Sequence, residues 1–519
     1  MPLSATAARL RARFLGRSAV FRWTLLAGCI AWAALEAAGV LGSRAIRAGT
    51  YDFMQRHRLW ATAPDPRIVV FDIDERSLAE MAPEFGRWPW PRDTLAAVLA
   101  HAEAAGAAAI VFDVLFSDPD RAHAGGDKAF EASVLASQHA YFPVVRLPPH
   151  NDARSRITLA DVPGLAVGPG AEGRSIALIL PFMRAVLDTR RLGTSTVKPD
   201  GDGVLRAFAF AQAHGGARVG SLPLAVARGL GEHRLDDSAE RLIVWREHAG
   251  VYPRVPFVEA WRCAEKPAAP SCLDLRGRIV VIGATAPSLH DVESTPLKAN
   301  HPGVDILATL IDNAIHARAF APLTPWLRFG MAMLALGAAA AIVFRGRLSS
   351  IRIATFFLPA LFATVGFVSL HSERVYLDLA MPAAIALTFL SGVGLYDALR
   401  ARVFRIDRMP GEGTWGVACV GSDRTAERFQ WCLYDAAAKS RCQVSALGRA
   451  NESIIAPAWS VVGLADHDAA ERLAAALPGR TGTWCRPFRA SGRFPECLYR
   501  ALADRHAAPA STEKTAYAI

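Results

Sequence analysis

Four long apolar segments constrain the fold of this chain more than any other feature. They cover residues 23–41, 326–344, 353–370 and 379–396. A helix rises 1.5 Å per residue, so the first segment reaches about 28 Å, close to the thickness of the hydrocarbon core of a bilayer. We therefore predict four membrane-spanning helices, in agreement with a composition that is 52% hydrophobic.

Arginines beside these segments predict their orientation. They cluster before the first segment, between the second and third, and after the fourth: Arg9, Arg11, Arg13, Arg17, Arg22; Arg345, Arg347, Arg352; Arg400, Arg402, Arg405, Arg408. By the positive-inside rule, residues 1–22 and the C-terminus are cytoplasmic and residues 44–325 lie outside the membrane. A cleaved signal peptide is the alternative for the first segment. Its length and the lack of a small-x-small site after it argue against that reading.

The region between the first two segments alternates apolar strands with helices. RIVVFDID (67–74) is a nearly continuous apolar run typical of a strand buried on both faces, and it ends in Asp72 and Asp74. A helix (ERSLAEM) and a rigid aromatic turn (WPWPR) follow, and we expect Asp93 to cap the next helix. Further strands end at Asp113 and run through RIVVIGAT (278–285), which we expect to be central. This alternation predicts a largely parallel or mixed α/β sheet.

These segments resemble the CHASE2 domain, an extracytoplasmic sensory module of bacterial membrane receptors. Three further stretches share the resemblance: GDGVLR (201–206), LRGRIVVIGATAPSLHDVESTP (275–296) and HPGVDILATLIDNAI (301–315). The similarity covers residues 44–320. It implies an extracytoplasmic sensor domain of a bacterial inner-membrane protein, preceded by one membrane helix and followed by three.

Acidic residues near the ends of the strands are the first candidates for a ligand site. Asp72, Asp74, Asp113 and Asp291 converge at one edge of the sheet if their strands are neighbours. Carboxylate oxygens suit Mg²⁺ or Ca²⁺, so a divalent metal is one reading, and we expect no other cofactor. The alternative is that these acids cap helices or pair with arginine. Arg87, Arg92 and Arg206 are the partners that we consider for them.

Two tryptophans complete the candidate ligand-binding residues. Trp88 and Trp90 are either walls of a pocket or a packed cover over the sheet edge. The full set of candidates is Asp72, Asp74, Trp88, Trp90, Arg92, Asp113, Arg206 and Asp291.

Two cysteines lie in the region predicted to be outside the membrane. Cys263 and Cys272 enclose a polar, proline-containing loop, AEKPAAPS. In an oxidising compartment such a pair can form a disulfide, and two free thiols are the alternative.

The tail after the fourth apolar segment has the sequence pattern of a separate domain. Residues 410–506 alternate strand-like and helical stretches in the order β-α-β-α-β-α, which predicts a small cytoplasmic α/β domain, and residues 507–519 are polar and expected to be disordered. The tail carries no kinase, cyclase, GGDEF-like or EAL-like signature. We therefore lean against enzymatic activity and expect a non-catalytic docking domain.

Three functions are compatible with this organisation. The first is a multipass sensor that binds a small-molecule or envelope signal outside the cell and engages a cytoplasmic signalling protein. The second is a scaffold or accessory subunit of a cell-envelope complex, and the third is an enzyme with an unrecognised catalytic tail. A homodimer is plausible for the sensor. Although the net charge is +10, the arginines cluster beside apolar segments, so the bilayer rather than nucleic acid is the expected partner.

Overall fold

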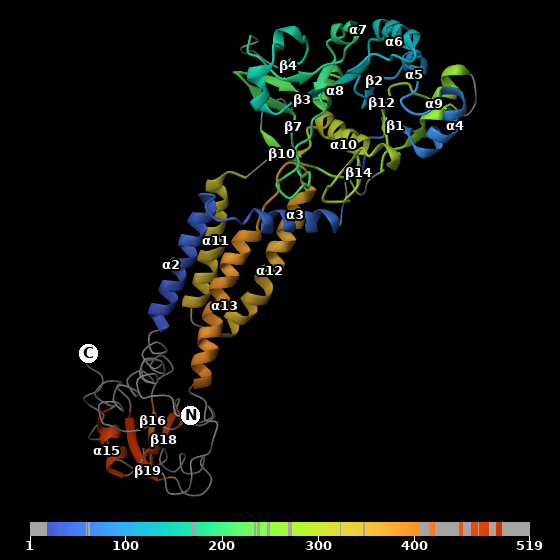
Figure 1. Ribbon diagram of the computed structural model, residues 1–519. Coiled ribbons are helices and arrows are strands. Elements are labelled where there is room, and N and C mark those ends of the chain that lie inside the picture. Colours follow the sequence, from blue (N-terminus) through green and yellow to red (C-terminus); the bar gives the residue numbers. More distant parts are fainter. Residues whose placement is uncertain are drawn as a thin grey trace. The chain divides into compact units, whose positions relative to one another are not determined.

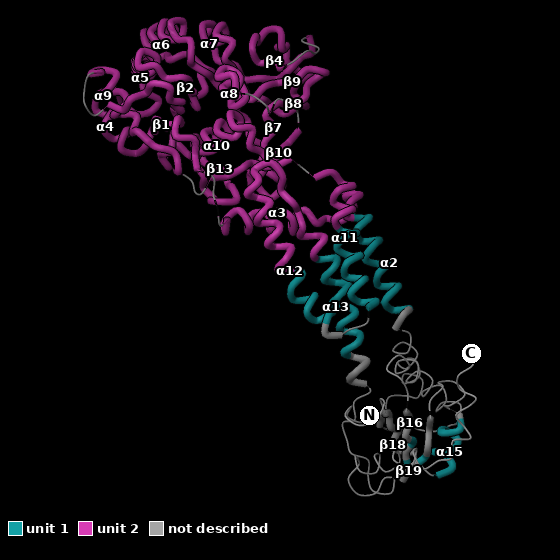
Figure 2. Tube along the Cα trace, turned by 180° about the vertical axis from the view of Figure 1, so that it is seen from behind, with its two compact units in different colours: residues 1–35, 332–358, 384–519 teal, residues 36–331, 359–383 magenta. Residues whose placement is uncertain are grey.

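The computed structural model describes residues 18–58, 60, 63–167, 173–232, 235, 239–246, 250–267, 272–321, 323–345, 348–403, 415–420, 446–449, 458–464, 467–476 and 484–489. The chain forms two compact units (Figure 2). The larger unit comprises Glu36–Met331 and Pro359–Ala383, and the smaller comprises Met1–Leu35, Ala332–Leu358 and Ala384–Ile519.

A mixed sheet organises the larger unit (Figure 1). Its strands, in spatial order, are β11 (Arg254–Pro256), β1 (Ile68–Ile73), β12 (Ile279–Ala284), β2 (Ala109–Phe112), β3 (Ala140–Arg146) and β5 (Leu178–Ile179), and β6 (Leu192–Thr194) also pairs with β3. All pairings are parallel except that of β3 with β5. The prediction of a mixed α/β domain is confirmed, and the strand expected to be central, β12, lies between β1 and β2.

Alternation along each strand divides the apolar side chains between two cores. In β1, Val69, Phe71 and Ile73 face one core, and Ile68 and Val70 face the other. The first core is covered by α4 (Glu75–Phe85), α5 (Arg92–Ala104), α6 (Ala124–Ala136) and α9 (Phe257–Glu265), and the second by α8 (Leu222–Gly229) and α10 (Gly303–Ile315). The unbroken apolar run of β1 follows from this arrangement, because a strand covered on both faces has no side exposed to water.

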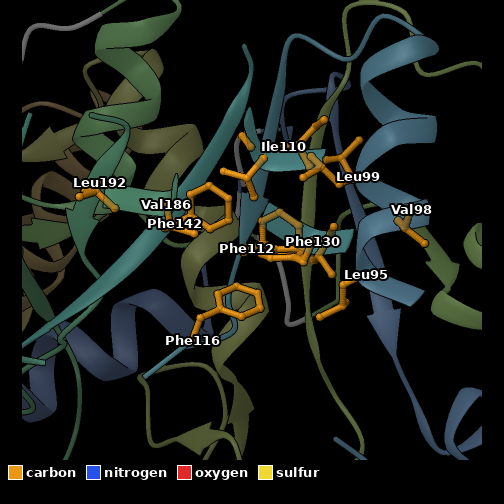
Figure 3. Packing of buried hydrophobic residues seen from close by; sticks show 14 of the residues in the cluster. Leu95, Val98, Leu99, Ile110, Phe112, Phe116, Phe130, Phe142, Val186 and Leu192 are labelled. Carbon is orange, nitrogen blue, oxygen red and sulfur yellow. The ribbon is translucent and has the colours of Figure 1, made fainter. Parts of the chain in front are cut away.

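Phenylalanine rings fill the centre of the first core. Phe112 stacks on Phe142 with ring centroids 5.2 Å apart, and Phe116 stacks on Phe130 at 4.7 Å. Figure 3 shows these rings together with Leu95, Val98 and Leu99 of α5. Strand β2 is thereby fixed against α5 and α6, and with it the position of Asp113 at its end.

The start of α5 differs from the expectation. Helix α5 begins at Arg92 with Pro91 as its N-cap residue, and Asp93 lies in the first turn rather than at the cap. Proline cannot donate a backbone hydrogen bond, so it fits a position where the helix would leave the amide without a partner. A carboxylate in the first turn still interacts favourably with the helix dipole.

Short elements complete the larger unit. They are α3 (Arg44–Arg56), α7 (Arg184–Asp188), η1 (Pro149–Arg154), η2 (Leu159–Asp161), η3 (Pro287–Leu289), and the strands β4 (Ala166–Val167), β7 (Ala207–Ala209), β8 (Ala211–His214), β9 (Ala217–Gly220), β10 (Glu240–Ile243), β13 (Val292–Glu293), β14 (His301–Pro302) and β15 (Ala319–Phe320). Strands β15, β10 and β7 form a small antiparallel sheet. In the sequence, β15 comes just before the second apolar segment.

In the part of the chain that the structure describes, four helices are long and apolar enough to cross a membrane. They are α2 (Ser18–Ala37), α11 (Pro325–Phe344), α12 (Leu348–His371) and α13 (Ala380–Val403), with candidate spans at Val20–Ala37, Pro325–Phe344, Ser350–His371 and Ala380–Ala398. The first ends at Ala37, before the predicted end at residue 41. Gly39 adopts a φ of +73°, a left-handed conformation that ends helices and that glycine accepts without strain.

Inside the smaller unit, aromatic and ionic contacts join α2 to α13. Phe21 stacks on Tyr396 with ring centroids 4.2 Å apart, and the Arg22 guanidinium lies 3.2 Å from the Asp397 carboxylate. Phe356 on α12 is 83% exposed, as expected for a side chain that faces lipid.

The described part of the tail holds an antiparallel sheet in the order β17 (Ala446–Arg449), β18 (Ala458–Leu464), β16 (Trp415–Val420), β19 (Trp484–Arg489), with helix α15 (His467–Ala476). Strand β17 was not expected from the sequence. The first and last helices predicted for the tail, and residues 507–519, lie outside the described residues.

Candidate functional site

Asp72 lies at the carboxyl edge of the central sheet, which we define by Asp72, Asp113, Asp291 and Asp305. The Asp72 carboxylate accepts hydrogen bonds from the Arg254 guanidinium at 2.8 Å and from the Thr285 hydroxyl at 2.6 Å. Arg254 also donates to Asp305 at 2.6 Å. The partner of Asp72 is therefore Arg254, and the pairing that we considered with Arg87, Arg92 or Arg206 is not formed. Strand β11 pairs with β1 and brings Arg254 there from a distant part of the sequence.

Asp74 caps a helix. It is the N-cap residue of α4, and its carboxylate accepts a hydrogen bond from the backbone N–H of Ser77 at 2.7 Å. This interaction satisfies one of the amides that have no partner within the first helical turn. The carboxylate of Asp74 is thus used locally, in the role that the alternative reading gave to these acids.

Asp113 and Asp291 lack a cationic partner among the residues that the structure describes. Burial, together with the smaller effect of the negative charge of Asp291, raises the pKa of Asp113 to about 7. Burial also raises the pKa of Asp291. The two carboxylates therefore form the part of the carboxyl edge where negative charge is least compensated.

Two glycines let the chain approach these aspartates closely. A Cβ on Gly303, the first residue of α10, would lie 2.6 Å from Oδ2 of Asp291. A Cβ on Gly283 in β12 would lie 3.0 Å from Cβ of Asp113 and 2.8 Å from Cγ2 of Val304. Within the described ranges, no three His, Cys, Asp or Glu side chains are placed to hold a metal ion.

Trp88, Trp90 and Arg92 lie together at the start of α5. Trp90 is 2% exposed and stacks on Phe257 with ring centroids 5.3 Å apart, and Trp88 meets Trp90 edge-on at 5.0 Å. The Arg92 guanidinium donates to the Asp127 carboxylate and to the backbone oxygen of Asp118. These contacts join α5 to α6 and α9. Both tryptophans pack against the first core, as the cover reading describes.

Arg206 occupies a different place from the aspartates. It is 4% exposed, and its guanidinium donates to the carboxylates of Asp52, Asp200 and Asp202 at 2.7–2.8 Å. The hydrogen bond from Arg206 lowers the pKa of Asp202 to about 2. Since Asp52 belongs to α3, this cluster attaches the Asp200–Arg206 turn to the helix that follows the first membrane span.

Further contacts attach the α/β domain to α3 and to the segment between α12 and α13. The Tyr51 hydroxyl donates to the backbone oxygen of Ile243 at 2.9 Å. Arg58 donates to the backbone oxygens of Trp245 and Leu370, each at 3.1 Å. The backbone N–H of Ala321 donates to the oxygen of Arg374 at 3.1 Å. We call this set, together with the Asp200–Arg206 turn and Arg328, the membrane collar; its other parts are α3, Arg58, residues 371–378 and the adjoining ends of β10 and β15.

A cavity of about 620 Å³ opens in the collar. This volume is typical of small-molecule sites. It is lined by Arg44, Ala45, Arg47, Ala48, Tyr51, Asp200, Gly201, Asp202, Arg206, Ala207, Glu240, Leu242, Ala321, Leu323, Arg328, Tyr376 and Asp378. Of the residues singled out from the sequence, Arg206 alone is among those that line it.

Sequence reasoning missed most of the collar. Arg47 and Asp378 are charged residues beside apolar segments, Arg328 lies within one, and these positions were the available signal. Nothing local in the sequence marks Arg254 or Asp305, because their pairing depends on which strand lies next to β1.

Cys263 and Cys272 are joined by a disulfide, with their Cα atoms 5.7 Å apart. Cys263 belongs to α9, so the bridge connects the end of this helix to the segment that leads into β12.

Comparison with protein families gives one match in this region. The model of the CHASE2 domain family matches residues 25–343, which is more than half of the chain. Comparison with curated proteins and with solved structures found no match.

Proposed function

The chain belongs to the CHASE2 domain family, whose members are extracellular sensor domains of membrane proteins, and we propose that it is a multipass sensor of the bacterial inner membrane. A small-molecule or envelope signal binds the α/β domain outside the membrane. Binding alters the packing of the membrane helices and the interaction of the cytoplasmic tail with a partner. A signal acts in this way only if it binds one of two conformations better than the other.

The membrane collar is the observation that carries this proposal. Buried polar contacts join the α/β domain both to α3, which follows the first span, and to residues 371–378, which connect the third and fourth. The Glu373 carboxylate, for example, forms an ion pair with Arg318, which lies just before β15, at 2.9 Å. Hydrogen bonds of defined geometry cannot stretch freely, so a shift of β10 or β15 moves the ends of the membrane helices.

Within the α/β domain, we propose Asp113 and Asp291 as the groups that respond to the signal. Their charges are not compensated by the described residues, so a cationic or hydrogen-bond-donating ligand gains most there. Asp72, Asp74, Trp88, Trp90 and Arg92 support this edge through the contacts described above. Arg206 connects the Asp200–Arg206 turn to α3 through its bonds to Asp52.

The arginine distribution supports a topology with both termini in the cytoplasm. Single cysteines at exposed positions test it. They are treated with a membrane-impermeant maleimide in cells whose outer membrane is permeabilised and whose inner membrane is intact. We expect labelling of Leu135→Cys on α6, which replaces a 70% exposed side chain. His467→Cys in the tail should label only after the inner membrane is permeabilised. Labelling in the reverse order would refute the topology.

We propose that the tail, residues 410–506, is a small cytoplasmic α/β docking domain without catalytic activity. Its partner would be a cytoplasmic signalling protein, and no cofactor is required. The test is in-cell crosslinking and capture with the full-length chain and with a chain that ends at Met409. Capture of a kinase, cyclase or response regulator by the full-length chain alone supports a sensor with a docking output.

Capture of one envelope complex by both chains would instead make the protein a scaffold subunit. The collar supplies a second discriminating variant, Glu373→Gln, which keeps the shape of the side chain but weakens the ion pair with Arg318. A sensor should show altered capture in this variant because the α/β domain and the membrane helices are less firmly connected. A scaffold should not.

A further inference from the structure

The collar cavity combines guanidinium groups whose donors are not used by the protein. Arg44 and Arg328 both line it, and among the described residues neither forms an ion pair. The Nε of Arg328 is buried and has no hydrogen-bond partner. An unpaired buried donor on a charged group is unfavourable unless something satisfies it.

Arg47 lies beside them with only loose partners. Its guanidinium is 3.6 Å from the Glu36 carboxylate and 3.8 Å from that of Asp378, longer than an ordinary hydrogen bond. Arg44 and Arg47 are three residues apart on α3 and therefore share one helix face. Three arginines thus approach one space with incomplete neutralisation.

The acidic residues around the cavity do not fully neutralise these three arginines: Glu36 and Asp378 are the two carboxylates that act on Arg47 and Arg328. Asp200 and Asp202 are bonded to Arg206, which also holds Asp52. Glu240 is exposed to solvent and forms no ion pair with a described residue. The arginine side of the cavity is therefore the side that attracts an anion.

We propose that this cavity binds a phosphate group through Arg44, Arg47 and Arg328. Planar guanidinium groups match the oxygen geometry of phosphate and bind it with paired hydrogen bonds. Large exposed apolar side chains adjoin these arginines in the sequence: Ile46 is 58% exposed, Trp326 83% and Leu327 50%. The phosphate belongs either to a lipid headgroup of the outer leaflet or to a soluble organophosphate.

This inference deepens the proposed function because it names a ligand chemistry for the collar. Arg47 contacts Glu36 at the end of α2 and Asp378 just before α13. A phosphate that attracts Arg47 competes with both carboxylates. Occupancy therefore changes the link between the ends of two membrane helices.

The test uses the full-length protein in nanodiscs and native mass spectrometry. One arm compares phosphatidylglycerol with phosphatidylcholine, and a second titrates glycerol 3-phosphate and inorganic phosphate while following Tm. We expect selective retention of phosphatidylglycerol for a lipid source, or saturable stabilisation by glycerol 3-phosphate for a soluble one. Loss of one arginine should weaken binding about tenfold or more, since each charge-assisted hydrogen bond contributes that much.

The variants are Arg44→Gln, Arg47→Gln and Arg328→Gln, with Arg47→Lys as a charge-preserving form. Arg374→Gln is the matched control, an exposed arginine in the collar that does not line the cavity. The proposal is overturned if phosphatidylglycerol is not retained in preference to phosphatidylcholine and neither glycerol 3-phosphate nor inorganic phosphate stabilises the protein, or if Arg374→Gln weakens binding as much as the cavity variants do. Partner capture is measured separately, so failure here and failure of the sensor function can be told apart.

Discussion

The carboxyl edge of the sheet and the membrane collar both bury charged side chains, but they balance them in opposite ways. At the edge, one guanidinium, that of Arg254, serves Asp72 and Asp305, while Asp113 and Asp291 are left without a described cationic partner. In the collar, Arg206 pairs with three carboxylates, while among the described residues Arg44 and Arg328 have no carboxylate within ion-pair distance. The edge thus leaves carboxylates without a described ion-pair partner, and the collar leaves guanidinium groups without one.

This difference separates charges that hold the structure from charges that are available to a ligand. A buried ion pair with complete hydrogen bonding is costly to break, because removal of one partner leaves the other uncompensated. A buried group without a partner is costly as it stands, and it gains from a proton or a ligand. The predictions below test this division, beginning with the strongest expected effect.

Arg206→Ala should destabilise the protein most, by about 3–5 kcal/mol, because Asp52 would remain buried without its cation. The measurement is thermal unfolding of the full-length protein in detergent. Arg184→Ala is the control: its partner Asp188 is in an exposed ion pair, with side chains 80% and 51% exposed. Such pairs contribute about 0–1 kcal/mol. Equal effects of the two variants would contradict the structural role of Arg206.

Asp113→Asn should flatten the dependence of stability on pH. The folded-state pKa of about 7 lies above the ordinary value of 3.8, so the folded protein binds more protons than the unfolded chain between these values. Stability therefore falls as pH rises from about 4 to about 7. A shift of this size corresponds to about 4 kcal/mol at full burial, and we expect about 2–3 kcal/mol. The difference in Tm between pH 5 and pH 8 should be smaller in the variant.

In the collar, the pKa shift of Asp202 has the opposite sign to that of Asp113. The pKa of Asp202 is lowered to about 2 by its hydrogen bond from Arg206, so this carboxylate stabilises the fold above pH 4 and the contribution is lost as pH falls through 2. Asp202→Asn should therefore reduce the loss of stability in acid and leave the pH 5 to pH 8 difference unchanged. If both variants altered the same pH range, the contrast between edge and collar would be incorrect.

Gly283→Ala should cost about 1–3 kcal/mol, the usual effect of overpacking a core. The added methyl group would lie 2.8 Å from Cγ2 of Val304, where α10 meets β12. Gly125→Ala in α6 is the matched control, since nothing lies within 4 Å of its added carbon. Chemical unfolding should show a loss for the first and little or no loss for the second. A neutral Gly283→Ala would mean that α10 can move away from the sheet.

Asp74→Ala should have the smallest effect, about 0.5–2 kcal/mol, the usual contribution of an N-cap side chain. Asp74→Asn should restore most of it, because asparagine also caps helices well. Unfolding measurements on the two variants distinguish the cap from a charged ligand contact. If asparagine were as harmful as alanine, the negative charge of Asp74 would have a role that the bond to Ser77 does not explain.

The sequence by itself determined the elements that depend on local patterns. The apolar runs of β1 and β12 and the long apolar helices were evident because burial on both faces, or in lipid, leaves no polar positions. The order of motifs identified the family. The predicted end of the first membrane helix, residue 41, lies beyond the observed end at Ala37, because this end depends on the conformation of Gly39 and not on hydropathy.

Only the tertiary structure decided how the charges are paired. Asp72 meets Arg254 because β11 lies beside β1, and Asp52 meets Arg206 although 153 residues separate them in the sequence. Apolar burial is non-directional, so composition and period are enough to predict it. Hydrogen-bonded ion pairs need particular atoms within about 3 Å, and those distances exist only after the chain has folded.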